Sequence, residues 1–219
     1  MAEDFVKIFG IERSGTVFTQ RLITLNIPGT LAMSNGFGWK HGEVQDPQWW
    51  LDNHRESSDF FKSIYEQKKE TGIPAVIVIK NPYSWYNSIK RYAARFKGYQ
   101  PFDDKWQYER FNRLYLHWHE ELLTKENKWY TSALIIRYED LLIDPRPQIQ
   151  RVADLIGKEV TQEMVIPDTV EMSATFNEKR RKKYLDVEKL DGEKTYLVNT
   201  TLDPKIWSIF GYNKIIKKP

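Results

Sequence analysis

Three short runs rich in valine and isoleucine constrain the fold of this chain more than any other feature of its sequence. They are Phe5–Phe9, Ala75–Ile79 and Leu134–Tyr138. Apolar runs of this length predict parallel strands that are covered on both faces. Each is followed by a turn and a helical pattern, near residues 16–25, 82–95 and 145–156. Repetition of strand, loop and helix predicts an α/β fold, with crossover helices flanking a central parallel sheet.

The rest of the chain fits one domain over residues 1–219. Further helices are predicted over 57–71 and about 105–127. The segment 26–52 is rich in Gly, Pro, Asn and Trp, which predicts a long functional loop with one short strand at Thr30–Met33. With 41% hydrophobic residues, 219 residues suffice for one sizeable core.

Charge and composition exclude several classes of protein. The 33 basic and 30 acidic residues leave a net charge of only +3, which argues against a nucleic-acid binder but allows a local anion pocket. There is no cysteine, hence no disulfide, thiolate metal site or cysteine nucleophile. Neither a membrane span of about 18 apolar residues nor a signal peptide is apparent. We therefore expect a cytoplasmic protein with no metal site.

The loop after the first strand predicts a phosphate cradle. Backbone N–H groups of 10–16 can surround an anion at the start of a helix. The spacing of Gly10 and Gly15 mimics a nucleotide P-loop, which then requires Lys and Ser/Thr. Thr16 and Val17 stand there instead, so the loop suits a phosphate better than a triphosphate with Mg²⁺. The alternative is a tight turn with a surface arginine, Arg13.

The stretch Phe9–Phe18 resembles the 5′-phosphosulfate loop of sulfotransferases that use 3′-phosphoadenosine 5′-phosphosulfate (PAPS), where Lys or Arg precedes Ser-Gly-Thr. The chain resembles the small soluble members of bacterial or phage type. The family has a P-loop-like fold. The resemblance implies metal-independent, in-line transfer of a sulfuryl group to a hydroxyl or amine acceptor, leaving 3′,5′-adenosine bisphosphate. It implies that the 5′-phosphosulfate is held by Arg13, Ser14, Gly15, Thr16 and Val17.

Two positions depart from the family pattern. Phe18 stands where the family commonly has the tryptophan that stacks on adenine. Val17 stands where the family commonly has a second hydroxyl residue, so it offers its backbone N–H instead.

Lys80 and Ser88 resemble the family's 3′-phosphate signature, a basic residue and a serine eight residues apart. Lys80 ends an apparent parallel strand, where open α/β sheets bind ligands. The usual cation of the family is arginine. Lysine keeps the charge but loses the bidentate geometry.

Two later segments add to the resemblance. Tyr138–Leu141 resembles a segment that places its tyrosine near the adenine and gives its two acids structural hydrogen-bonding roles. The basic run 179–183, with Arg180 and Arg181, either closes over the 3′-phosphate or is a solvated charge run. Residues 202–212 resemble the closing helix and Gly-Tyr of small members.

For catalysis we expect His41 to be the base, with Lys40 at the transferred group and Arg13 at the bridging oxygen of the leaving phosphate. Lys40 and His41 resemble a Lys-x-His of many cytosolic members. Alternatively, His41 is a loop residue exposed to solvent, and the base is His54, Glu12 or Glu43. His117 and His119 are expected to be packing or surface residues.

The acceptor class stays open among carbohydrate, lipid, phenol and peptide. Aromatic side chains of the 26–52 segment either line its pocket or belong to the core, namely Phe37, Trp39, Trp49 and Trp50.

Two other functions compete with this reading. A P-loop kinase or NTPase ranks second because the lysine after Gly15 is absent. A catalytically inactive nucleotide-binding module of the same fold is the third.

Overall fold

A parallel sheet of four strands forms the centre of the computed structural model, which describes residues 4–54, 59–95, 103–167, 169–171, 174–175, 185 and 192–216. The strand order is β2-β1-β3-β4. The strands are β1 (Asp4–Phe9), β2 (Thr30–Met33), β3 (Pro74–Ile79) and β4 (Ser132–Arg137). This confirms the predicted α/β fold and all four predicted strands. Tyr138, predicted to end the last strand, instead begins a helix.

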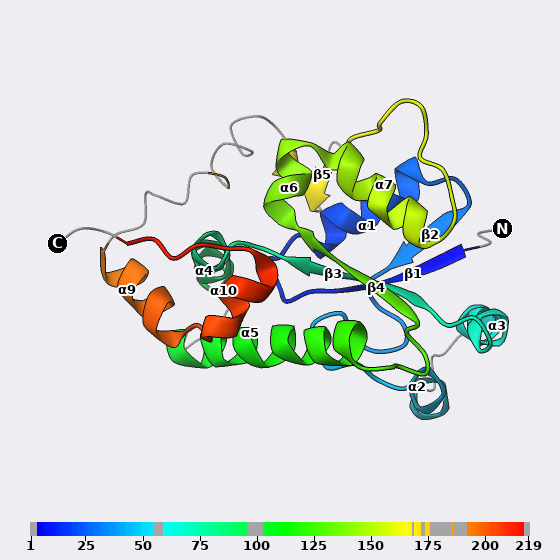
Figure 1. Ribbon diagram of the computed structural model, residues 1–219, viewed down its shortest axis with the longest axis horizontal. Coiled ribbons are helices and arrows are strands. Elements are labelled where there is room, and N and C mark those ends of the chain that lie inside the picture. Colours follow the sequence, from blue (N-terminus) through cyan, green and yellow to red (C-terminus); the bar gives the residue numbers. More distant parts are fainter. Residues whose placement is uncertain are drawn as a thin grey trace.

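Helices cover both faces of this sheet (Figure 1). On one face lie α1 (Thr16–Asn26), α6 (Tyr138–Ile143) and α7 (Pro145–Leu155). On the other lie α3 (Asp59–Lys68), α4 (Pro82–Ala93), α5 (Asp104–His119), α9 (Gly192–Thr201) and α10 (Pro204–Phe210). A π-helical turn, η2 (Glu120–Thr124), continues α5, and α2 (Pro47–Asn53) precedes α3. A small antiparallel pair is formed by β5 (Thr169–Glu171) and β6 (Ala174–Thr175).

The alternation of side chains along β1 explains the two cores. Val6 and Ile8 are buried against α1, α6 and α7, whereas Phe5 and Phe9 enter the larger aromatic core on the opposite face. This is the two-residue period of a strand with both faces covered. Lys7 shares the face of Phe5 and Phe9 and is fully buried there.

Four helices begin with the same signal, an Asp or Asn followed by Pro. In α2, α4, α7 and α10 the first side chain accepts a backbone N–H of the first helical turn, and the proline occupies that turn. The helix α2 was not predicted, because weak periodicity made the whole 26–52 segment read as a loop. Asp46-Pro47 is the signal that marks its start.

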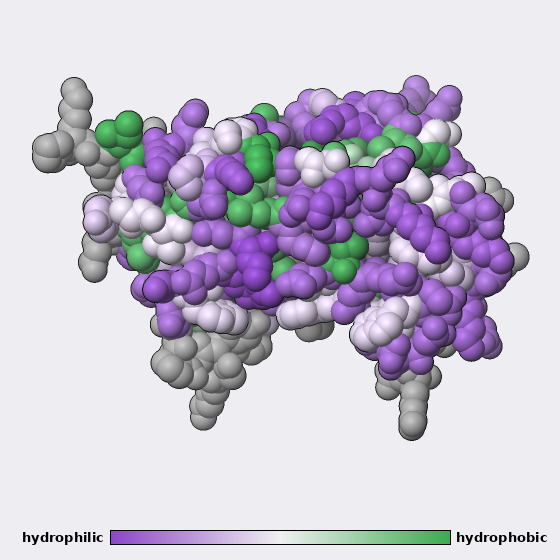
Figure 2. Space-filling model, turned by 60° about the horizontal axis from the view of Figure 1, so that its bottom comes forward, coloured by the Kyte–Doolittle hydropathy of each residue, from purple (hydrophilic) through white to green (hydrophobic). Residues whose placement is uncertain are grey.

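The surface agrees with a water-facing exterior on the side seen in Figure 2. Hydrophilic residues cover most of that face, and hydrophobic residues form small separate groups. Within the described ranges, no helix combines the length and the apolarity needed to cross a bilayer.

Candidate active site

The carboxyl ends of β1 and β3 and the start of α6 meet at one cavity. Its lining comes from four separate parts of the sequence. The lining residues are Glu12, Arg13, Gly15, Thr16, Val17, Phe18, Lys40, His41, Lys80, Ser88, Tyr92 and Tyr138. The edge of a parallel sheet at the strands' carboxyl ends is where such folds bind ligands.

The loop after β1 is shaped by close approaches that only glycine allows. Gly15 is the N-cap of α1 with φ of 101°, and a Cβ atom there would lie 2.2 Å from Cδ2 of Tyr138. A Cβ atom on Gly10 would lie 2.7 Å from the carbonyl oxygen of Val78. Arg13 also has a left-handed φ, 67°. Such changes of backbone hand beside a helix N-terminus form concave anion-binding nests.

Besides Lys40, the cations Arg13 and Lys80 reach this cavity from different elements. The Arg13 guanidinium lies 5.2 Å from the centre of the Tyr92 ring on α4. Lys80 is 2% exposed, and its ammonium lies 5.1 Å from the centre of the Tyr138 ring. Ser88, one of the buried residues of α4, lines the same cavity. The structure therefore brings together the two predicted phosphate-binding groups.

Phe18 and Tyr138 meet edge to face beside the loop. Their ring centres are 6.1 Å apart with an interplanar angle of 78°. Both residues are almost entirely buried, yet both contribute to the cavity lining. Together with Val17 and Tyr92 they form its apolar part.

Hydrogen bonds to Gly10 hold Lys40 and His41 at the cavity. The Gly10 N–H donates to the Lys40 carbonyl over 3.0 Å, and His41 Nδ1 donates to the Gly10 carbonyl. Because a carbonyl only accepts, Nδ1 carries the proton in the neutral ring and Nε2 carries the lone pair. Burial lowers the pKa of His41 to about 4, and the Gly10 bond and Glu12 only partly oppose this. The imidazole of His41 is thus unprotonated at neutral pH.

The alternative bases occupy other environments. Glu12 lines the cavity, but Arg110 binds both of its carboxylate oxygens, at 2.5 and 3.0 Å. Glu43 pairs with Arg113 at the exposed surface. His54 is exposed and stacks on Trp50, with ring centres 4.9 Å apart. The three carboxylate and histidine alternatives are therefore either paired or outside the cavity lining.

The two remaining histidines behave as expected for packing residues. His117 Nε2 accepts the Val44 N–H at 3.0 Å, and His119 lies edge-on to Phe210.

Comparison with known proteins decides the family. The family model described as the sulfotransferase domain matches residues 53–201, which is more than half of the chain. The chain belongs to the sulfotransferase family. It is accordingly an enzyme that transfers sulfate. No curated protein matches the sequence. The matched region holds Lys80, Ser88 and Tyr138, while the loop with Arg13 and the Lys40-His41 pair precede it.

The aromatic residues predicted for the acceptor pocket of this sulfotransferase separate into core and rim. Phe37 is fully buried, and Trp50 packs on it with ring centres 5.8 Å apart. Trp49 is exposed on α2. Trp39 alone of the four adjoins His41, with ring centres 5.0 Å apart, and it is 54% exposed.

Arg110 and Trp106 of α5 complete this rim, and no motif in the sequence pointed to Arg110. The Arg110 guanidinium lies 5.9 Å from the Trp39 ring centre and 5.8 Å from that of Trp106. It also donates to the His41 carbonyl at 3.0 Å. Residues 98 apart in the chain carry no shared periodicity, so only folding makes Arg110 the partner of Glu12.

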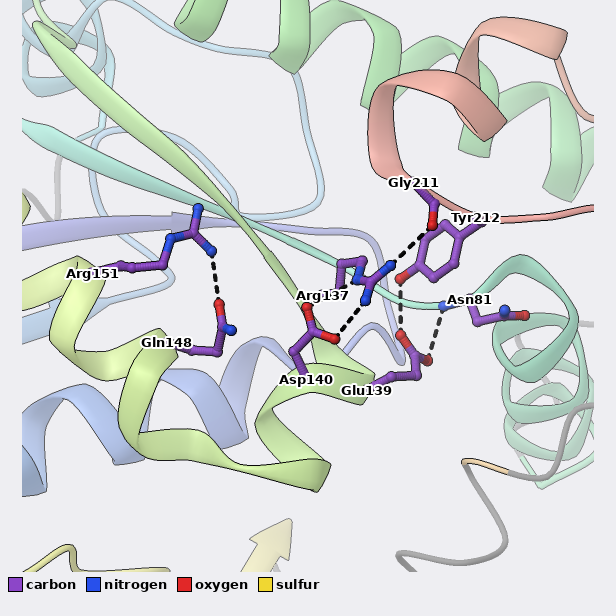
Figure 3. A network of polar contacts seen from close by, with 8 residues as sticks. All are labelled: Asn81, Arg137, Glu139, Asp140, Gln148, Arg151, Gly211 and Tyr212. Atoms are coloured by element: carbon purple, nitrogen blue, oxygen red, sulfur yellow. Dashed lines mark hydrogen bonds and ion pairs between the residues drawn. The ribbon is translucent and has the colours of Figure 1, made fainter.

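The acidic residues after β4 have structural roles in this sulfotransferase, as expected (Figure 3). Glu139 accepts the Asn81 N–H at 3.0 Å and the Tyr212 hydroxyl at 2.9 Å. Arg137 binds both oxygens of Asp140 and donates to the Gly211 carbonyl. Burial raises the pKa of Glu139. The network ties the end of the chain to the strand ends that carry Lys80 and Tyr138.

Two predictions concern other parts of the chain. Arg180 and Arg181 lie outside the described residues. Among the residues that are described, no three His, Asp or Glu side chains gather as metal ligands would.

Proposed function

We propose that this sulfotransferase takes its sulfuryl group from PAPS and passes it to a hydroxyl or amine acceptor by in-line, metal-independent transfer. The observation that carries the proposal is the shared cavity of Arg13, Lys80 and His41. It offers two separate cations for a substrate with two anionic groups and an unprotonated imidazole for an acceptor.

Three groups of cavity residues would bind the donor. The loop 10–17 and the start of α1 would hold the 5′-phosphosulfate with backbone N–H groups, because Gly15 at the N-cap has no side chain to occupy them. Lys80 and Ser88 would hold the 3′-phosphate. Phe18 and Tyr138 supply the apolar part of the cavity, which suits the adenine.

The residues of the cavity would divide the transfer step among them. His41 Nε2 takes the proton of the acceptor as the new bond from acceptor oxygen or nitrogen to sulfur forms. The bond from sulfur to the bridging phosphate oxygen breaks, and 3′,5′-adenosine bisphosphate leaves with that electron pair. Arg13 stabilises the charge that develops on this oxygen, and Lys40 assists at the transferred group.

The acceptor would approach past the rim defined above by Trp39 and Trp106. Trp39 is the exposed aromatic residue next to His41, and the Arg110 guanidinium on α5 lies over its ring. A small-molecule acceptor could then lie with its hydroxyl or amine at His41 while an apolar part contacts the indole.

Calorimetric titration tests the donor assignment first. We expect 3′,5′-adenosine bisphosphate to bind without Mg²⁺ and at least tenfold more tightly than AMP, because AMP lacks the 3′-phosphate. Preference for Mg-ATP would instead favour a P-loop kinase. Binding of the bisphosphate without transfer to any acceptor in a broad screen would favour an inactive module.

Matched variants of α4 test the 3′-phosphate site. We expect Ser88→Ala to weaken bisphosphate binding about 10- to 100-fold, the value of one hydrogen bond to a charged group. Ser84→Ala is the control, since Ser84 is buried one turn earlier and is not part of the cavity lining. Equal affinities for the two variants would contradict the assignment.

Two further substitutions test the catalytic roles. Arg13→Ala should reduce transfer at least about 100-fold, the scale of losing one charge-stabilising donor. His41→Ala should abolish most turnover and keep bisphosphate binding. Near-normal transfer by either variant would refute the role given to that residue.

A further inference from the structure

Lys7 places a charged group in the middle of the aromatic core. It lies on β1, it is 0% exposed, and its ammonium is 5.2 Å from the centre of the Phe9 ring. An uncompensated charge at such a position would be very costly. Lys7 is not among the residues that line the active-site cavity. Its burial therefore needs an explanation other than contact with substrate.

Backbone carbonyls compensate this charge. The Lys7 ammonium donates to the carbonyl oxygens of Ser34 at 3.2 Å, Gly36 at 2.7 Å and Gly38 at 2.6 Å. An ammonium group has three N–H donors, so these bonds use all of them. Burial lowers the pKa of Lys7 to about 7, and repulsion by Lys40 acts in the same direction.

The backbone that supplies these carbonyls has an unusual shape. Gly36, Phe37 and Gly38 have consecutive positive φ angles of 118°, 51° and 104°. A residue with a side chain, such as Phe37, rarely adopts this conformation, because its Cβ atom crowds the backbone there. The surroundings must therefore hold the segment in place, and the ammonium of Lys7 lies where its carbonyls converge.

The same segment carries the proposed catalytic pair. We define it as the 34–41 loop. Ser34 connects the two ends of the loop. Its carbonyl accepts a hydrogen bond from Lys7, and its hydroxyl accepts one from Nζ of Lys40 over 3.4 Å. Gly10 then binds Lys40 and His41 through its backbone. The attachments through Lys7 and Gly10 thus belong to β1 and the turn after it. Two further bonds reach the loop from elsewhere, from Arg110 to the His41 carbonyl and from the Tyr130 hydroxyl to the Phe37 carbonyl.

We propose that Lys7 is a positioning residue, whose buried ammonium folds the 34–41 loop around itself and so presents Lys40 and His41 to the cavity. The catalytic consequence rests on the proposed function of His41. The structural consequence does not, because it concerns only where the loop lies.

The ionisation of His41 reports the position of the loop without any assay of activity. In the intact protein the groups that act on His41 are Glu12, Lys40, Arg110 and the Gly10 carbonyl, and its pKa is about 4. Its NMR signals should therefore not titrate between about pH 5.5 and 6.5, a range below the pKa of about 7 at which Lys7 loses its charge. In Lys7→Met the side-chain volume is kept but the donors are lost. The loop should leave Gly10, and the pKa of His41 should rise toward about 6.5.

A second lysine serves as the control for replacing a lysine by methionine. Lys69→Met removes an exposed lysine paired with Glu66 and should leave His41 non-titrating. Thermal unfolding first establishes that each variant is folded. If folded Lys7→Met also keeps His41 non-titrating, Lys7 does not position the loop and the proposal is wrong.

Chemical rescue covers the case in which Lys7→Met does not fold. Lys7→Ala leaves room for n-propylammonium, which replaces the missing carbons and the ammonium, whereas 1-propanol lacks the charge. We expect n-propylammonium, and not 1-propanol, to restore folding or the non-titrating His41 of Lys7→Ala. If n-propylammonium restores neither, the proposal is overturned.

Kinetics then separates this proposal from the proposed function. In Lys7→Met, or in Lys7→Ala, we expect kcat to fall at least tenfold while the Kd for 3′,5′-adenosine bisphosphate changes less than twofold. Recovery of kcat with n-propylammonium supports positioning. A changed His41 titration with an unchanged kcat would leave Lys7 as the holder of the loop but remove His41 as the base.

Discussion

Two arginines on one helix make a sharp test of how burial determines the contribution of an ion pair. Arg110 and Arg113 lie one turn apart on α5, and each pairs with a glutamate from a preceding loop. The side chains of the Arg110–Glu12 pair are 12% and 11% exposed, whereas those of Arg113–Glu43 are 63% and 51% exposed. We predict that Arg110→Met is strongly destabilising and Arg113→Met is nearly neutral.

The magnitudes follow from what each substitution leaves behind. Arg110→Met leaves the Glu12 carboxylate buried without its partner and frees the His41 carbonyl, so we expect a loss of about 3 kcal/mol in the free energy of unfolding. Methionine preserves most of the contact with Trp39 and Trp106. Arg113→Met removes a solvent-screened pair and should cost about 0.5 kcal/mol or less.

Urea unfolding measures both changes. With a slope of about 2 kcal/mol per M, Arg110→Met should lower the midpoint by about 1.5 M and Arg113→Met by about 0.2 M. Adding Glu12→Gln to Arg110→Met should recover part of the loss, because the unpaired charge is then removed. Equal destabilisation by the two arginine variants, or no recovery in the double variant, would refute this reasoning.

Three further predictions concern the cavity. Because the pKa of His41 is about 4 in the folded protein and about 6.5 when unfolded, the unfolded chain binds the extra proton between these values. The free energy of unfolding should therefore fall by about 3 kcal/mol from pH 6.5 to pH 4. In urea titrations, His41→Asn should remove this pH dependence of the free energy of unfolding and His54→Asn should not. Equal pH dependence in both variants would contradict the assignment to His41. Lys80→Ala should weaken bisphosphate binding about 30-fold by calorimetry, as expected for a lost charged hydrogen bond of about 2 kcal/mol, and unchanged affinity would remove Lys80 from the site. Gly15→Ala should cost about 3 kcal/mol in thermal or urea unfolding, because the added methyl group would meet the Tyr138 ring at a left-handed φ, so wild-type stability would contradict the tight loop.

The agreement between the predicted and observed fold has a local physical cause. The Val and Ile runs, the glycines and the Asp/Asn-Pro helix starts act over a few residues, so they can be recognised in the sequence. The helix α2 was missed because its short apolar pattern was weak, although Asp46-Pro47 marks its start. The helix predicted over 105–127 ends as an α-helix at His119 and continues as a π-helical turn over 120–124.

The candidate site shows where local reasoning ends. The loop with Arg13 and the strand end at Lys80 were predicted because parallel strands place their carboxyl ends together. His41 was one of several possible bases, and no spacing in the sequence separates it from His54. The structure shows that His41 is buried at the cavity and bonded to Gly10 whereas His54 is exposed, and both facts depend on which segments fold against each other.

The sequence by itself determined the α/β class, the order of the strand–loop–helix units and the residues at the strand ends. These depend on short-range periodicity and on backbone preferences that each residue carries with it. Only the tertiary structure decided that Arg110 binds Glu12, that Arg110 lies over the Trp39 ring and that Lys7 meets the carbonyls of the 34–41 loop. Such contacts join residues about 30 to 100 positions apart, and they form because burying a charge or a ring requires a partner that only the packed chain provides.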